Sequence, residues 1–205
     1  MDNMLIFAPG VWTPDRKGLI FGYGTMSEIR VGWLSLEKGS DGTRPWRPWL
    51  DRDGTAGSVN ISPDARWVAY QSSDSGKYEV YLERFPDLGE RQSVSGEVGG
   101  WNPVWSRDGR ELFYRRLSDG AMMAVPIQTT PTLRVGTPEK LFDDPGTFQM
   151  RPPVPGGGSG RYWDLAPDGR FLMVKAVAAA TSAEPQGFIH VQNWTDELKR
   201  LTQPR

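Results

Sequence analysis

The chain has 205 residues, of which 24 are Lys or Arg and 25 are Asp or Glu, so its formal net charge at pH 7 is −1. This balance gives no electrostatic support for binding to nucleic acid or to an anionic membrane. The absence of cysteine excludes disulfides and thiolate metal sites and leaves the compartment undecided. We find no run of about 18 apolar residues that would span a membrane, and no signal-peptide pattern at the start of the chain.

A short turn motif recurs four times along the chain, each time next to apolar residues. The copies occupy residues 12–15, 61–64, 105–108 and 165–168. Proline presets φ for a type I turn, and aspartate accepts hydrogen bonds from its local backbone. Glycine after the aspartate, as at Gly109 and Gly169, supplies a left-handed residue. We expect mild strain at Ala65, which takes this position in the second copy, and a first turn lengthened by one residue through Arg16–Gly18.

Apolar residues follow each turn at equivalent positions. Four residues after the aspartate lie Leu19, Val68, Leu112 and Leu172, and six residues after it lie Phe21, Tyr70, Tyr114 and Val174. Positions two apart share one face of a strand. The residue between them is apolar as well, so each strand is predicted to be buried on both faces between neighbouring sheets.

The spacing of the repeats predicts an all-β fold. The equivalent turn positions Pro14, Pro63, Arg107 and Pro167 are separated by 49, 44 and 60 residues. The first two intervals match the roughly 40–50 residues of a four-stranded propeller blade. We therefore predict a β-propeller of about four four-stranded antiparallel blades in a single domain over residues 1–205. The predicted blades cover residues 5–50, 57–95, 101–142 and 162–202. A long Pro/Gly-rich insertion over residues 143–161 explains the third interval, and we expect it to be mobile.

The repeats resemble a known family at the residues that surround the second and third turns. Residues 62–72 and 79–82, and residues 106–114 and 122–126, follow the pattern of TolB-type, WD40-like (PD40) β-propeller repeats. The whole chain is similar to the carboxy-terminal half of propellers attached to bacterial eukaryote-like Ser/Thr kinases. The kinase motifs themselves, a Gly-rich loop, His-Arg-Asp and Asp-Phe-Gly, are missing from the sequence.

The resemblance implies a bacterial protein, extracytoplasmic as part of a longer chain, with six blades as the usual number. Three arrangements follow: four blades that close on themselves, a homodimer that pairs through open propeller edges, or an incomplete, open part of a six-bladed propeller. We favour the open arrangement, because the first turn comes only a dozen residues into the chain.

The leading functional prediction is a non-catalytic scaffold that binds a protein or peptide partner, as the sensor or interaction portion of a bacterial signalling protein. Loops at one end of the blades converge near the axis of a propeller and form a concave surface. Aromatic side chains exposed beside glycines make rigid anchors, which favours Trp101 and Trp163. The predicted partner-binding residues are Trp101, Asn102, Arg151, Arg161, Tyr162 and Trp163.

The alternative is a glycan-active enzyme that uses channel-facing carboxylates. Such an enzyme needs two acids about 5–10 Å apart in a cleft. The recurring aspartates are explained by the turns instead, the only histidine is His190, and no Gly-x-Ser-x-Gly motif occurs. We therefore predict no catalytic residue, cofactor or metal site. For the tryptophans at strand positions, Trp12, Trp67 and Trp105, we expect packing between blades.

Overall fold

The computed structural model describes residues 5–25, 28–143 and 163–174. Its strands form antiparallel sheets in chain order, which we call blades 1 to 4. Blade 1 contains β1 (Leu5–Trp12), β2 (Gly18–Gly24), β3 (Ile29–Ser35) and β4 (Trp46–Leu50). Blade 2 contains β5 (Ala56–Ile61), β6 (Trp67–Ser72), β7 (Glu79–Arg84) and β8 (Gln92–Ser93).

Blade 3 follows a single turn of 3-10 helix, Gly96–Val98. It contains β9 (Gly100–Trp105), β10 (Glu111–Arg116), β11 (Met122–Gln128), β12 (Arg134–Val135) and β13 (Glu139–Phe142). The described part of blade 4 is a hairpin of β14 (Trp163–Leu165) and β15 (Phe171–Met173). Within the described ranges, no helix has the length and apolar character needed to cross a bilayer.

The topology confirms the predicted all-β, propeller-type architecture. Blades 1 and 2 are four-stranded meanders, and each strand pairs with its neighbour in the chain. The proline-flanked segment Trp46–Leu50 is an edge strand, as proline requires. In blade 3 two short strands, β12 and β13, share the outer edge, because both pair with β11. The predicted insertion beyond Asp143 and the predicted outer strands of blade 4 lie outside the described residues.

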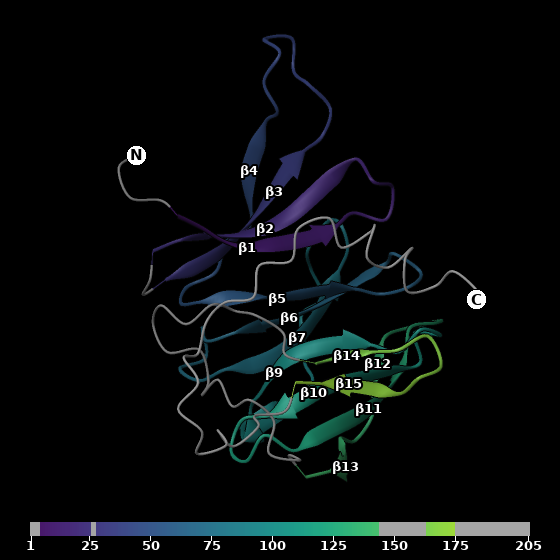
Figure 1. The fold of residues 1–205 in the computed structure, drawn as a ribbon. Helices are drawn as coiled ribbons and strands as arrows, with labels where there is room; N and C mark the ends of the chain where they lie inside the picture. The colour runs from purple at the N-terminus through teal and green to yellow at the C-terminus, as the bar shows by residue number, and fades with distance from the viewer. Residues whose placement is uncertain (1–4, 26–27, 144–162, 175–205) are drawn as a thin grey trace, which may run out of the picture.

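The sheets stack face to face, with blade 1 at one end, followed by blade 2 and blade 3 (Figure 1). The β14–β15 hairpin packs on the other face of blade 3. An apolar cluster fills each space between consecutive sheets. From blade 1 to blade 4 the clusters include Val31 and Tyr70, then Trp67 and Leu112, then Phe113 and Trp163. No described sheet closes on itself, so the described blades form an open stack.

The repeated turns share one set of hydrogen bonds. The hydroxyl groups of Thr13, Ser62 and Ser106 each donate to the carboxylate two residues later, over 2.5, 2.6 and 2.7 Å. In all four copies that carboxylate also accepts the backbone N–H two residues further on. The hydroxyl and this N–H lower the pKa of Asp15 and Asp108. These contacts assign the aspartates to turn formation.

The residue after each aspartate has a positive φ. The values are 58° at Arg16, 58° at Ala65, 70° at Gly109 and 82° at Gly169. The strain predicted for Ala65 is therefore confirmed, because its Cβ crowds the backbone in this region. The lengthening predicted for the first turn is wrong. Arg16 takes the position of the glycine, and the N–H of Thr13 donates to the carbonyl of Gly18, five residues further on. The second and third copies make the corresponding hydrogen bond.

Replacing Ala65 by glycine should stabilise the protein. Left-handed backbone costs a residue with Cβ roughly 1–2 kcal/mol, while glycine loses roughly 0.5–1 kcal/mol of extra backbone entropy on folding, so we expect a net gain of about 0.5–1 kcal/mol. Urea unfolding of Ala65→Gly measures this gain. Ala69→Gly is the matched control, because Ala69 is buried in β6 without a positive φ and should lose stability. Equal losses in the two variants would contradict strain at Ala65.

Candidate functional site

The first strands of blades 2 and 3 carry equivalent distortions. Strand β9 packs along β5 and β6, and the β5–β6 and β9–β10 ladders each contain an irregularity. At these points Ser58 and Asn102 have φ values of 49° and 53°. Both residues lie six positions before the aspartate of their turn. Strained backbone of this kind often occurs at functional positions, so these bulges are a candidate site.

Side chains of blade 2 satisfy backbone groups at the edge of blade 3. The N–H of Asn102 donates to Gln71 Oε1 over 2.9 Å, and the N–H of Trp105 donates to Asn60 Oδ1 over 2.8 Å. The Ser58 hydroxyl donates to Asn102 Oδ1 over 2.6 Å. Because β9 is an edge strand, these N–H groups have no ladder partner on that side, and the side chains replace it.

The structure describes three of the predicted partner-binding residues, Trp101 and Asn102 on β9 and Trp163 on β14. Asn102 is only 3% exposed and its side chain is engaged by Ser58. Trp101 is partly buried, and its Nε1 has no partner among the described residues. Trp163 is 3% exposed within the cluster between blades 3 and 4, so the expectation of an exposed ring is wrong for this residue.

The other predicted site residues, Arg151, Arg161 and Tyr162, lie outside the described residues, as does His190. Three residues that were not predicted from the sequence fix Asn102 and Trp105 in place: Ser58, Asn60 and Gln71. One signal for Ser58 was present, because it lies at the same distance from its aspartate as Asn102 does. Gln71 and Asn60 act across blades, and no spacing within one repeat shows that.

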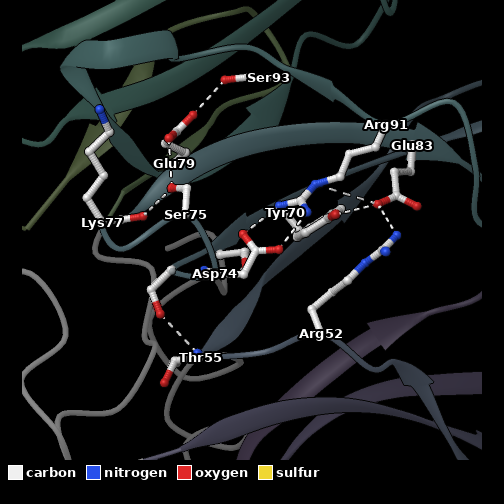
Figure 2. A network of polar contacts seen from close by, with 12 residues as sticks. Arg52, Thr55, Tyr70, Asp74, Ser75, Lys77, Glu79, Glu83, Arg91 and Ser93 are labelled. Carbon is white, nitrogen blue, oxygen red and sulfur yellow. Dashed lines mark hydrogen bonds and ion pairs between the residues drawn. The ribbon is translucent and has the colours of Figure 1, made fainter.

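A buried polar network lies at the interface of blades 1 and 2 (Figure 2). Its centre is the Glu83 carboxylate on β7, which is fully buried. Glu83 Oε1 accepts the Tyr70 hydroxyl over 2.5 Å and Arg52 Nη2 over 2.7 Å. Arg52 comes from the segment that joins blade 1 to blade 2, so this ion pair ties the connection to the second sheet.

Arg91 forms the second half of the network. Its guanidinium donates to both carboxylate oxygens of Asp74, over 2.5 and 2.8 Å, and lies over the Tyr81 ring at 3.5 Å from the centroid. This pair lowers the pKa of Asp74. Burial and the hydrogen bond to Glu83 raise the pKa of Tyr70 well above its ordinary value. The Tyr70 hydroxyl therefore stays protonated and acts as a donor.

The carboxylates of this region are engaged in structural contacts. Glu79 accepts hydroxyl hydrogens from Ser75 and Ser93, each over 2.8 Å, and Asp74 is held by Arg91. Glu83 Oε2 is the one oxygen here that lacks a partner in the described part of the chain. Among the described residues, no group of three or more acidic, His or Cys side chains is arranged to hold a metal ion. The network therefore holds the connection between blades 1 and 2 against blade 2.

The outer face of blade 1 is apolar and aromatic. We define the aromatic face as Trp12, Leu19, Phe21, Tyr23 and Trp46. Its rings contact one another, with centroids 5.9 Å apart for Phe21–Trp46 and 5.2 Å apart for Tyr23–Trp46. Trp12 and Trp46 are 60% and 42% exposed. The opposite face of blade 1 packs on blade 2. On the aromatic face Phe21 and Tyr23 are each only 8% exposed, so Trp12 and Trp46 are the side chains that it presents to solvent.

This exposure corrects the expectation for Trp12. The equivalent residues of blades 2 and 3, Ile61 and Trp105, pack on the preceding blade. No described sheet precedes blade 1, so Trp12 lacks that cover. The predicted packing between blades is confirmed for Trp67 and Trp105, which are both buried. Trp12 is therefore the one strand tryptophan of the three that is presented to solvent.

Comparison with known proteins identifies similar folds only. No family model and no curated protein sequence matches the chain. The putative TolB from Agrobacterium tumefaciens aligns with 70% of this chain at 19% identity and a TM-score of 0.52. TolB from Acinetobacter baumannii aligns with 87% of it at 19% identity and a TM-score of 0.53. The chain spans 51% and 39% of the length of these two proteins, and the likeness shows a TolB-like β-propeller fold.

Proposed function

We propose that the chain is a non-catalytic β-propeller scaffold that binds a protein partner, with the aromatic face of blade 1 as its main contact surface. The observation that carries this proposal is the burial of the equivalent faces in the other blades. Val68 and Tyr70 in blade 2, and Leu112 and Tyr114 in blade 3, are fully buried against the preceding sheet. The aromatic face occupies the same repeat positions, so its shape and chemistry suit another β-sheet.

Exposed tryptophans strengthen this proposal. Contiguous apolar surface that is exposed on a soluble domain often marks an interaction site, and tryptophan is enriched among the residues that dominate binding energy. Trp12 and Trp46 provide two such side chains on one face. The partner that we propose is a second copy of this chain, which would pair through the open end of the stack.

Trp101 is proposed as a secondary contact, beside the bulge that holds Asn102. The Nε1 of Trp101 is buried, so we propose that the exposed part of its ring makes an apolar contact with a peptide. Arg151, Arg161 and Tyr162 keep their proposed role in partner binding. We also propose that the scaffold serves as the interaction portion of a bacterial signalling protein, in keeping with the family resemblance of the repeats.

Sedimentation equilibrium of the purified chain tests the main proposal. We expect a concentration-dependent dimer, and Trp46→Glu should weaken it about 30-fold or more, because a central tryptophan contributes about 2 kcal/mol or more to an interface. Val98→Glu is the matched control, since Val98 is a comparably exposed apolar residue in the 3-10 turn before blade 3. It should leave the association unchanged.

Two outcomes would contradict the proposal. A chain that stays monomeric at every concentration does not pair through this face. Trp46-dependent binding on a glycan array, without self-association, would assign the aromatic face to carbohydrate and favour the glycan-active alternative.

A further inference from the structure

The turn of blade 4 closes one residue earlier than the other three. In blades 1 to 3 the residue three before the aspartate pairs with the residue four after it, as Trp105 does with Leu112. We call this pairing the common register. In blade 4 Leu165 pairs with Phe171, three residues after Asp168. We call this pairing the short register.

The difference traces to one side chain. In the common register a hydroxyl at the first turn position accepts the backbone N–H five residues on, as Ser106 Oγ does from Glu111 over 2.9 Å. Thr13 and Ser62 accept the corresponding N–H groups over 2.8 and 2.9 Å. Blade 4 has Ala166 at this position and no hydroxyl. The N–H of Ala166 donates to the carbonyl of Arg170, only four residues on, over 2.8 Å.

A slip of one residue turns a strand over, because successive side chains point to opposite faces. In blade 3, Leu112 and Tyr114 face the preceding sheet and are fully buried. Their equivalents in blade 4, Leu172 and Val174, are 58% and 52% exposed, which overturns the burial predicted from the repeat. Phe171 packs on blade 3 instead, with its ring centroid 5.2 Å from that of Phe113.

Both faces of β15 are able to fill the same space. The short register buries Phe171 and Met173 against blade 3, and the common register would bury Leu172 and Val174 there. Each choice places two apolar side chains in the interface, so burial alone discriminates weakly between the two registers. The hydrogen bonds of the turn therefore determine which of the two registers is more stable.

We propose that the β14–β15 hairpin is a register switch, held in the short register by the missing hydroxyl at Ala166. The register determines which apolar pair blade 4 presents outward: Leu172 and Val174 in the short register, Phe171 and Met173 in the common one. A further sheet that packs on this end selects the register whose outward pair fits it better. This switch goes beyond the proposed binding function, which depends on the other end of the stack.

Cysteine pairs report the register directly, since the natural chain has no cysteine. Residues directly opposite in an antiparallel pair are close enough for a disulfide. Asp164→Cys with Leu172→Cys joins positions that face each other in the short register. Asp164→Cys with Met173→Cys joins positions that would face each other in the common register. Mild oxidation followed by mass spectrometry of the linked peptides gives the yield of each disulfide.

We expect the 164–172 disulfide to dominate in the otherwise unchanged chain. Ala166→Thr should raise the ratio of the 164–173 to the 164–172 disulfide about five- to tenfold, because it restores the hydroxyl contacts and Thr13 shows that threonine fits this turn. Ala166→Val is the matched control, with the same shape and no hydroxyl, and should leave the ratio unchanged. Equal ratios in the threonine and valine variants would overturn the proposal. Failure of both disulfides to form in every variant would also overturn it, because the hairpin would then hold neither register.

Discussion

Glu83→Ala is expected to destabilise the protein by about 1–4 kcal/mol, which combines the buried Tyr70 hydroxyl left without its acceptor with the loss of a pair to the partly exposed Arg52. The substitution leaves the Tyr70 hydroxyl and the Arg52 guanidinium without their shared acceptor, and both groups lie at the interface of blades 1 and 2. Because whole domains are stable by only about 5–15 kcal/mol, this loss is a large fraction of the total stability. Urea unfolding followed by tryptophan fluorescence measures it.

Two further variants separate the network from simple loss of volume. Glu83→Gln keeps the size of the side chain and one acceptor oxygen, so we expect a loss smaller than that of the alanine variant. Glu90→Gln is the exposed control, because Glu90 pairs with Arg84 at the surface and such pairs contribute about 0–1 kcal/mol. A double-mutant cycle of Glu83→Gln with Tyr70→Phe should show coupling of about 0.5–3 kcal/mol. Additive effects in that cycle would show that the 2.5 Å contact contributes nothing of its own.

The blades were predictable because their information is local and repeated. Each aspartate turn is followed by apolar residues with strand periodicity, and the hydrogen bonds of Ser62 and Ser106 show why the motif needs these residue types. Four copies of the same turn motif predicted both the number of sheets and their order. The division of the outer edge of blade 3 between β12 and β13 was not predictable, since β12 has only two residues and follows no repeated pattern.

The polar network was not predictable from spacing. Arg52, Asp74 and Arg91 come from three separate connecting segments, and only the stacking of blades 1 and 2 brings them together. Each is an ordinary charged residue between strands in the sequence. Gln71 lies within β6 and was not predictable either, because it accepts an N–H from the next blade.

The register of blade 4 shows the limit of arguing from a repeat. Its sequence keeps the proline and the aspartate, which suggested an identical turn. The sequence shows that Ala166 stands where the other turns have a hydroxyl residue. Its effect on the strand register was not predictable, because in the other three turns the hydroxyl always accepts a backbone N–H. In our proposal, a single missing acceptor changes which face of a strand is buried.

The tryptophans provide the second large expected effect. Trp67→Ala should destabilise the protein by about 3–5 kcal/mol, the usual cost of removing a large aromatic side chain from a core. Trp67 is fully buried in the cluster between blades 2 and 3. The guanidinium of Arg84 lies 4.6 Å from its ring centroid, and this cation–π contact is lost as well. Thermal unfolding followed by circular dichroism, together with urea titration, measures the loss.

Trp12→Ala is the matched control, because Trp12 also lies beside an aspartate turn but is 60% exposed. We expect a change of less than about 0.5 kcal/mol in the stability of the monomer, as for other surface positions. At concentrations where the proposed dimer forms, the same variant should weaken association without unfolding the chain. The two substitutions therefore separate the two roles of tryptophan in one repeat: a side chain covered by a neighbouring blade stabilises the fold, and a side chain on an uncovered blade is available to a partner. Equal destabilisation of the monomer by both variants would mean that the aromatic face is already covered, and the proposed contact surface would have to be abandoned.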